Sequence, residues 1–392
     1  MQVISTEKLP IKLWLDDIED GAMEQTKNLA NLPFTYHHIA IMPDAHQGYG
    51  MPIGGVMATE GVVIPNAVGV DIGCGMCAVK TSLTKIDTEI LKKIMGEIRK
   101  AIPVGFNHNK ETQNESLMPK RDWDFMGEEV PIVNNQYTSA LYQLGTLGGG
   151  NHFIEIQKGS DGHIWIMIHS GSRNLGLKIA DHYNKLAVKL NQKWFSVVDK
   201  KQELAFFPIE TEEAKDYLRE MQYAVEFALA NRKLMIDNIT GIFYKKIGTK
   251  EIWFDEMINI AHNYASWENH FGKNVLIHRK GATLARKGTI GIIPGSQGSK
   301  SYIVEGLGNP DSFESCSHGA GRIMGRKQAQ RELNLKDEIK KLDDQNIIHA
   351  IRGVKDLDEA PGSYKDISEV MDNQKDLVKV LVELTPLAVI KG

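Results

Sequence analysis

The segment Asp71-Ile72-Gly73-Cys74-Gly75 places a carboxylate and a thiol three residues apart on one glycine-rich turn. Both side chains can reach a single cation, and a cysteine thiolate can bridge two metal ions because its sulfur has more than one lone pair. The apolar run at residues 76–81 follows at once and predicts a β-strand. The segment therefore predicts a metal site at the end of a strand.

Three histidines further along the chain are candidates for the remaining metal ligands: His152, His169 and His262. Each of them alone is more often a hydrogen-bonded structural residue than a ligand. Together with Asp71 and Cys74, they favour a metal centre. Soft donors of this kind favour zinc, cobalt or iron over manganese, and residue chemistry leaves the identity of the metal open.

Two glycine-rich stretches are suited to binding phosphate. Residues 145–150 and 294–299 can each direct backbone N–H groups at an anion. Most such stretches are only tight turns, because glycine adopts positive φ without steric cost. His318 lies between Ser317 and Gly319 and is followed by Arg322, which predicts an exposed nucleophile that faces a bound phosphate.

Length and composition describe a folded protein. The chain has 392 residues, of which 42% are hydrophobic and 24% charged, unlike a disordered chain. No proline- or serine-rich linker divides it, which favours a single domain over residues 1–392. Three cysteines are too few for a disulfide framework and favour a reducing, cytoplasmic location. Charges in the first thirty positions and the lack of a long apolar stretch argue against secretion and membrane insertion.

The formal net charge of −4 argues against a protein that coats nucleic acid by bulk charge. It allows a local basic groove. Arg322, Arg326, Lys327 and Arg331 are spaced so that a helix places several of them on one face.

Apolar periodicity predicts a mixture of helices and strands. Helices are expected at residues 88–101, 178–193 and 211–245. Strands are expected at residues 36–42, 56–64, 76–81, 163–168, 274–277, 289–293 and 301–304. Turns next to such strands carry the polar motifs, so we expect side chains there to converge on one pocket: Asp44, Cys74, His169, Ser296 and His318. Residues 107–133 are polar and rich in asparagine, which predicts an exposed excursion.

Motifs spread over the chain resemble those of the RtcB family of RNA-splicing ligases. They are Asp71-Ile72-Gly73-Cys74-Gly75, Gly149-Gly150-Asn151-His152-Phe153-Ile154-Glu155, His169-Ser170-Gly171-Ser172-Arg173, Pro294-Gly295-Ser296, His318-Gly319-Ala320-Gly321-Arg322 and Val389-Ile390-Lys391-Gly392. The resemblance covers about residues 43–392. It implies an α+β fold of the RtcB type, a single large domain of short strands with a metal and nucleotide pocket at their ends. Periodicity alone does not predict that fold.

The resemblance also implies an activity, which is that of a GTP- and manganese-dependent RNA ligase. Such an enzyme joins a 3′-phosphate or 2′,3′-cyclic phosphate RNA end to a 5′-hydroxyl end, in RNA repair or tRNA splicing. The route would pass through a covalent histidine–GMP intermediate and an RNA(3′)pp(5′)G intermediate. RNA would be the main partner, and an activating protein of the archease type a further one.

Roles for individual residues follow from the same resemblance. One Mn²⁺ would bind Asp71, Cys74 and His152, and a second would bind Cys74, His169 and His262. His318 would be the nucleophile that attacks GTP. The remaining nucleotide contacts, to which His152 and His262 also belong, would come from Asn151, Phe153, Ile154, Glu155, Asn263, Pro294, Gly295, Ser296, Gln297, Ser301, Gly319, Ala320, Gly321 and Lys391. Terminal RNA phosphates would bind Arg173, Arg322 and Arg326.

The chain differs from the family pattern in two details, and there are two alternative functions for the same residues. Gln297 stands where the family often has methionine, and the chain is shorter than many relatives. A binuclear metallophosphoesterase that acts on nucleic-acid ends would use the same ligands, but it has no need for His318. A non-catalytic RNA-binding module is disfavoured by the acidic balance and by the absence of alternating aromatic and basic residues.

Overall fold

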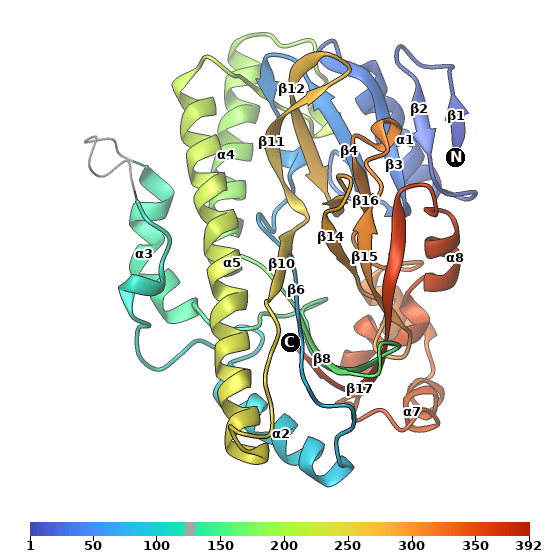
Figure 1. Cartoon of the computed structure of the whole chain (residues 1–392). Helices are drawn as coiled ribbons and strands as arrows, with labels where there is room; N and C mark the ends of the chain where they lie inside the picture. Colours follow the sequence, from blue (N-terminus) through green and yellow to red (C-terminus); the bar gives the residue numbers. More distant parts are fainter. Residues whose placement is uncertain (122–129) are drawn as a thin grey trace.

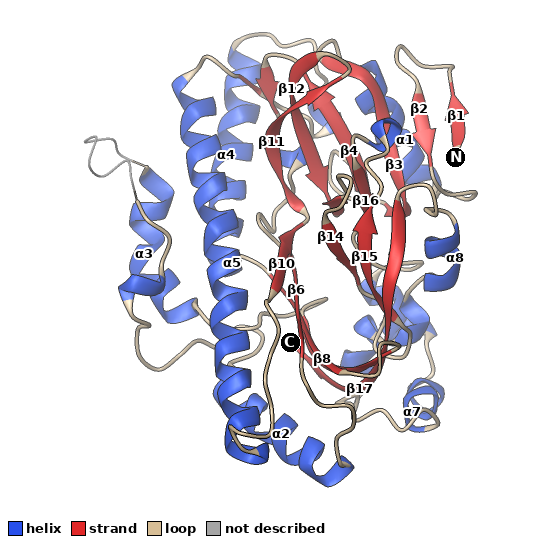
Figure 2. Cartoon of the chain, viewed as in Figure 1, coloured by secondary structure: helices blue, strands red, loops and turns tan. Residues whose placement is uncertain are grey.

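The protein is described here from a computed structural model that covers residues 1–121 and 130–392. Two large sheets lie next to each other, with helices on their outer faces (Figures 1 and 2). The six-stranded sheet has the order β1 (Gln2–Ile4), β2 (Ile11–Leu13), β3 (Thr35–His46), β4 (Ile53–Thr59), β12 (Lys273–Lys280) and β11 (Asn263–His270).

The seven-stranded sheet is antiparallel throughout and carries most of the site. Its order is β10 (Ile258–Ala261), β6 (Gly75–Lys80), β8 (Ile164–Ser170), β7 (Phe153–Gly159), β17 (Val378–Lys391), β15 (Ser301–Gly306) and β14 (Ile290–Ile293). Two short pairs complete the strands: β13 (Ala282–Leu284) with β16 (Ser315–Ser317), and β5 (Val62–Val63) with β9 (Phe207–Pro208).

Side chains of β6 alternate between two cores, as expected for a strand with both faces covered. Cys77 and Val79 pack in the core beneath α2 and α5, whereas Met76 and Ala78 pack in the core on the opposite face of the sheet. Because both faces are buried, the strand reads as a nearly continuous apolar run.

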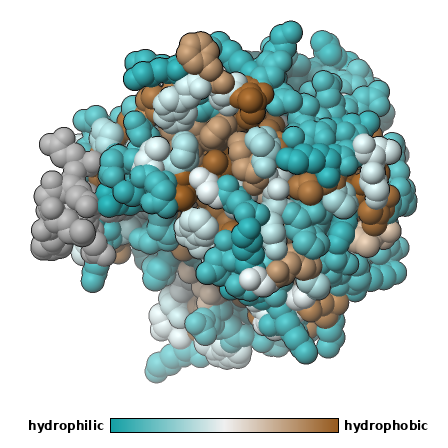
Figure 3. All heavy atoms as spheres, turned by 90° about the horizontal axis from the view of Figure 1, so that it is seen from above, coloured by the Kyte–Doolittle hydropathy of each residue, from teal (hydrophilic) through white to brown (hydrophobic). Residues whose placement is uncertain are grey.

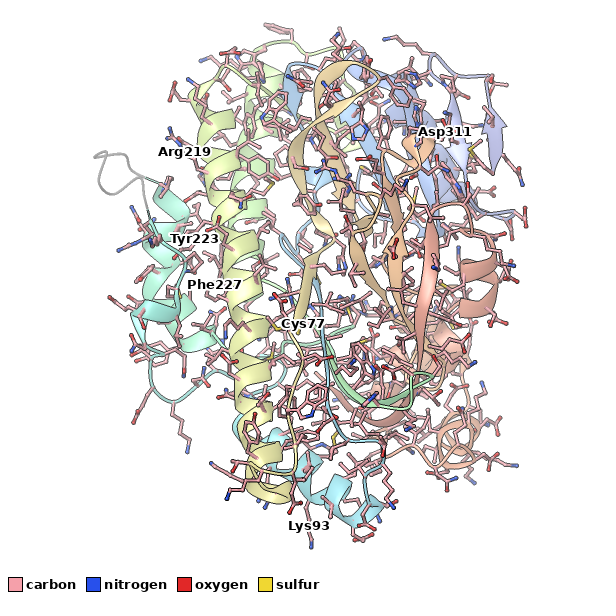
Figure 4. The ribbon with its side chains drawn as sticks, viewed as in Figure 1. Cys77, Lys93, Arg219, Tyr223, Phe227 and Asp311 are labelled. Atoms are coloured by element: carbon pink, nitrogen blue, oxygen red, sulfur yellow. The ribbon has the colours of Figure 1, made fainter. Side chains whose placement is uncertain are left out.

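Helices cover the outer faces. They are α1 (Asp20–Asn31), α2 (Thr88–Ala101), α3 (Pro131–Gln143), α4 (Arg173–Lys193), α5 (Glu212–Ile247), α6 (Arg326–Glu332), α7 (Leu335–Asp343) and α8 (Ile367–Asp372). The longest, α5, begins where the Thr211 hydroxyl accepts a hydrogen bond from the Ala214 N–H, and it ends before Gly248. Figure 4 shows Tyr223 and Phe227 on α5 and Cys77 on β6, and Tyr223 and Phe227 belong to one buried core.

The predicted α+β class is confirmed. The helix predicted at residues 88–101 is α2, the one at 178–193 begins earlier as α4, and the one at 211–245 is α5. Each predicted strand overlaps an observed one, although the run at 56–64 is divided between β4 and β5. Sequence periodicity missed the other strands, which are β1, β2, β7, β9, β10, β11, β13, β16 and β17, and the helices α1, α3, α6, α7 and α8. Of the expected excursion at residues 107–133, positions 122–129 lie outside the described residues, and most side chains at 107–121 are exposed. The prediction is wrong at residues 130–133, because α3 begins there and Val130 and Val133 are buried in a core.

The face seen from above in Figure 3 is mostly hydrophilic, with hydrophobic side chains in small groups between the polar ones. None of the described helices is both long and apolar enough to cross a membrane.

Candidate active site

Strand ends of the seven-stranded sheet place most of the predicted site residues along one edge. Cys74 directly precedes β6 and His152 directly precedes β7, whereas His169 lies near the end of β8. These positions adjoin because neighbouring strands are antiparallel, with Phe153 paired to His169. His262 lies between β10 and β11, where the chain passes from one sheet to the other.

Two groups of potential metal ligands share Cys74. Asp71, Cys74 and His152 form one group, and Cys74, His169 and His262 form the other; within each group the potential ligand atoms lie within 4.8 Å of one another. Cys74 Sγ lies 3.4 Å from Nε2 of His152 and 3.3 Å from Nε2 of His169. The structure therefore brings together the five predicted ligands, in the two groups that the resemblance implies.

The electrostatics of this cluster fit a bound cation. Burial raises the pKa of the Cys74 thiol well above its ordinary value, and the charge of Asp71 raises it further. Burial also lowers the pKa of His169 and of His262 well below the usual range, so both imidazoles are neutral and have lone pairs for coordination. A divalent cation would supply the positive charge that a buried thiolate needs.

Backbone geometry holds these ligands in place. Gly73 adopts a positive φ of 74°, and a Cβ atom there would lie 2.7 Å from the Val225 Cα, so the turn requires glycine to pack against α5. Nδ1 of His169 lies 3.1 Å from the carbonyl oxygen of Asn151. A carbonyl only accepts hydrogen bonds, so Nδ1 carries the proton and Nε2 is left for a metal.

His318 is oriented by a buried carboxylate. Nδ1 of His318 lies 2.6 Å from Oδ2 of Asp44, and the same oxygen accepts hydrogen bonds from the backbone N–H groups of His318 and Gly319. Asp44 is fully buried. This arrangement keeps the proton on Nδ1 and leaves the lone pair of Nε2 free, which is what a histidine nucleophile requires. The His318 ring lies beside that of His262, with 4.8 Å between centroids.

An inner cavity of about 160 Å³ begins at His318. Burial raises the pKa of the Glu155 carboxyl in its wall to about 8, against the opposing charge of Lys391. The predicted nucleotide-contacting residues that line it are Asn151, Phe153, Glu155, Pro294, Gly295, Ser296, Gln297, Gly319, Ala320, Gly321 and Lys391. This cavity therefore collects most of the predicted nucleotide contacts.

An outer cavity of about 1050 Å³ adjoins the inner one and is lined by four of the five predicted metal ligands, whereas the fifth, His169, lines the inner cavity. Asp71, Cys74, His152 and His262 line it, and so does Asn263. Nδ2 of Asn263 donates a hydrogen bond to the Asp71 carbonyl, 2.9 Å away, so Asn263 also supports the metal turn. Because the outer cavity has the greater volume, it can accept a larger molecule than the inner cavity can.

Three predicted contacts line neither cavity. Ile154 packs in the core beneath α2 and α5, and Ser301 is fully buried, where its hydroxyl accepts a hydrogen bond from the Gly295 N–H. Arg173 donates hydrogen bonds to the Thr146 hydroxyl and the Gly105 carbonyl. These residues support the walls of the site from behind.

Glu359, which no sequence motif marks, lines the inner cavity and contacts two arginines that line both cavities. Its carboxylate lies 3.1 Å from Arg322, 3.2 Å from Arg326 and 3.5 Å from Lys391. Tyr364 donates a further short hydrogen bond to it. Most hydrogen-bond donors of Arg322 already have partners, because its guanidinium also donates to the carbonyls of Met324 and Asp358. The Arg326 side chain, in contrast, is 53% exposed.

A third group of potential ligands, formed by Glu268, His270 and Glu314, is already neutralised. Arg279 makes two hydrogen bonds to the Glu268 carboxylate, and Arg286 contacts both Glu268 and Glu314. Since arginine supplies the positive charge there, this group is an ion-pair network and needs no cation.

A nucleophilic histidine oriented by a carboxylate, next to paired metal-ligand groups, is typical of enzymes that combine covalent and metal catalysis. The family model described as tRNA-splicing ligase RtcB matches residues 25–392. The RNA-splicing ligase RtcB of Escherichia coli K12 is 39% identical, over 100% of this chain and 99% of that protein. The tRNA-splicing ligases RtcB of Nanoarchaeum equitans and Thermococcus kodakarensis are 32% and 30% identical, each over 98% of this chain and 95% of that protein. The chain belongs to the RtcB family.

Proposed function

We propose that the protein is an RNA ligase that joins a 3′-phosphate or 2′,3′-cyclic phosphate end to a 5′-hydroxyl end at the expense of GTP. Membership of the RtcB family and the names of the relatives support the ligase activity. The observation that carries the chemistry is the free Nε2 of His318, which Asp44 orients at the junction of the inner and outer cavities.

The first step would join GMP to the protein. Nε2 of His318 attacks the α-phosphorus of GTP, the Nε2–phosphorus bond forms, and the bond to the β-phosphate oxygen breaks so that pyrophosphate leaves. Asp44 accepts the hydrogen bond from Nδ1 throughout and stabilises the positive charge that develops on the ring. The inner cavity would hold the guanosine, since most of the predicted nucleotide contacts line it and neither Asp71 nor Cys74 does.

Later steps would use the outer cavity. The RNA 3′-phosphate accepts GMP from His318 and becomes RNA(3′)pp(5′)G, and the 5′-hydroxyl of the second strand then displaces GMP. Cys74 would be shared by two Mn²⁺ ions, one held with Asp71 and His152 and the other with His169 and His262. Divalent ions at these positions supply charge neutralisation at phosphate and lower the pKa of an attacking hydroxyl.

A metallophosphoesterase is the weaker alternative. It would account for the metal-ligand groups, but hydrolysis gives no role to the pair of His318 and Asp44 or to the inner cavity. No observation on the described residues favours it over the ligase.

The direct test is incubation of the protein with α-labelled GTP and Mn²⁺, followed by addition of an oligonucleotide pair with 3′-phosphate and 5′-hydroxyl ends. We expect an acid-labile label on the protein that is lost when RNA is added, together with a joined product. A protein that never acquires label and only removes phosphate from RNA would contradict the ligase and support the phosphoesterase.

Arg326 should matter more for RNA than for GTP. Replacing Arg326 by Ala is expected to lower end joining roughly 10- to 100-fold, the loss of a charge-assisted hydrogen bond, and to lower His318 labelling much less. Arg326→Lys should recover only part of the joining, because a point charge cannot reproduce bidentate geometry. Both reactions can be measured on one preparation.

Two further variants complete the comparison with Arg326. Arg331→Ala, on an exposed position of the same helix, should leave both reactions unchanged. Arg322→Ala should lower both, since Arg322 holds two backbone carbonyls and Glu359. Equal losses of joining and labelling in Arg326→Ala would contradict a role in binding RNA.

A further inference from the structure

His46 lies at the last position of β3, in the wall between the two cavities. Among the described residues, those that line both cavities are His46, Ile53, Asn151, His318, Arg322 and Arg326. His318 is the nucleophile of the proposed function, and the two arginines are charged. His46 is thus a second imidazole at the place where nucleotide and RNA would meet.

Hydrogen bonding fixes the tautomer of His46. Its Nδ1 lies 3.1 Å from the main-chain carbonyl oxygen of Asp44, which can only accept a hydrogen bond. Nδ1 therefore carries the proton, and Nε2 has a free lone pair. Burial lowers the pKa of His46 to about 4, so the ring is neutral near pH 7. Asp44 in this way fixes the tautomers of two imidazoles: its carboxylate accepts the hydrogen bond from His318 Nδ1, and its main-chain carbonyl accepts the one from His46 Nδ1.

The chemistry of Nε2 limits what His46 can bind. A bare lone pair repels phosphate oxygens, which are acceptors themselves, and it attracts a hydrogen-bond donor. His46 belongs to neither metal-ligand group that contains Cys74. At the junction of the cavities, the donor that an incoming RNA end offers is a hydroxyl, and the 5′-hydroxyl must lose its proton when it attacks phosphorus.

We propose that His46 is a catalytic residue of the sealing step, in which Nε2 accepts a hydrogen bond from the attacking RNA 5′-hydroxyl. This inference rests on the proposed function. In the step, the bond between O5′ and the 3′-phosphorus forms, and the bond from that phosphorus to the GMP phosphate oxygen breaks. GMP leaves with the electron pair, and the hydroxyl proton passes by way of Nε2 to solvent. The hydrogen bond orients O5′ for attack.

The test compares His46→Asn with His163→Asn. Asparagine can still donate a hydrogen bond from its amide to the Asp44 carbonyl, but it has no acceptor at the position of Nε2. His163 is a matched control, because its Nδ1 also lies 3.0 Å from a backbone carbonyl, that of Thr81, and the residue is half-buried outside both cavities.

Two reactions are measured on each variant: labelling of His318 by α-labelled GTP, and sealing of a chemically prepared RNA(3′)pp(5′)G end under single turnover at saturating 5′-hydroxyl strand. His46→Asn should lower the sealing rate constant about 100-fold and lower labelling far less. His163→Asn should match the wild-type protein in both reactions.

Three results would overturn the proposal. They are unchanged sealing in His46→Asn, equal losses of sealing and labelling, and a sealing defect that disappears when more 5′-hydroxyl strand is added. Equal losses would show that His46 only supports Asp44. A wild-type protein that neither takes up label nor seals the prepared end would instead refute the proposed function itself, so the two failures are distinguishable.

Discussion

Replacing His318 by alanine is expected to abolish covalent labelling by GTP, with a fall on the order of 10⁴-fold or more, as for removal of other enzyme nucleophiles. Nε2 of His318 is the one atom that the proposed first step cannot replace. The fold should survive, because Asp44 keeps its hydrogen bonds from the backbone N–H groups at 318 and 319. Labelled protein on a denaturing gel measures the first effect, and the thermal unfolding midpoint measures the second.

Two controls make the His318 result specific. His318→Asn keeps an amide that can donate to Asp44, and it should lose the label just as completely. Both variants should still seal a prepared RNA(3′)pp(5′)G end, since that step follows the action of the histidine. Retention of label in either variant would refute His318 as the nucleophile.

Replacing Cys74 by alanine is expected to remove both metal ions together. The thiol is the atom that the two ligand groups share, so its loss leaves each group with two ligands. Changes at residues that only support metal ligands cost roughly 10- to 100-fold in affinity, and loss of a shared ligand should exceed that at both sites. Elemental analysis of purified protein loaded with Mn²⁺ gives the metal content per chain.

Cys77 provides a matched control for Cys74. It is also buried, in the core beneath α2 and α5, and Figure 4 labels its position on β6. Cys77→Ala should keep two ions, whereas His152→Ala and His169→Ala should each first weaken one. Full occupancy of two ions in Cys74→Ala would exclude the shared thiolate.

Local signals made part of the fold predictable. The helix α2 agrees with its predicted bounds, because Asp87 caps its first N–H groups and the apolar side chains follow helical spacing. The strand β17 escaped prediction. Its first half does alternate like a strand, with Val378, Val380, Val382 and Leu384 at every second position. Pro386 follows, where the pairing with β7 shifts its register, and a proline argues against one continuous strand of this length.

The site, like the fold, was predictable where local motifs mark its residues and not where contacts between distant segments create it. Glycine-flanked motifs pointed to Asp71, Cys74 and His318, and the structure places these residues around one junction. The sequence also predicted that Asp44 converges there, but the hydrogen bond from His318 depends on the approach of β3 to β16, which spacing cannot reveal. Glu359 has no motif around it, because its role comes from four partners that are distant in sequence or in a neighbouring turn.

The place of β17 has a consequence for how the protein is made. This strand is the last of its sheet in chain order, yet it pairs with β7 on one side and β15 on the other. A nascent chain that has emerged from the ribosome only as far as β15 still lacks the strand that joins the two halves of the sheet. The walls that carry Glu155 and Ser296 are then not yet joined by backbone pairing, and Lys391 is missing from the inner cavity. Such long-range pairing slows folding, so catalytic competence should appear late, in one cooperative step after β17 has been synthesised.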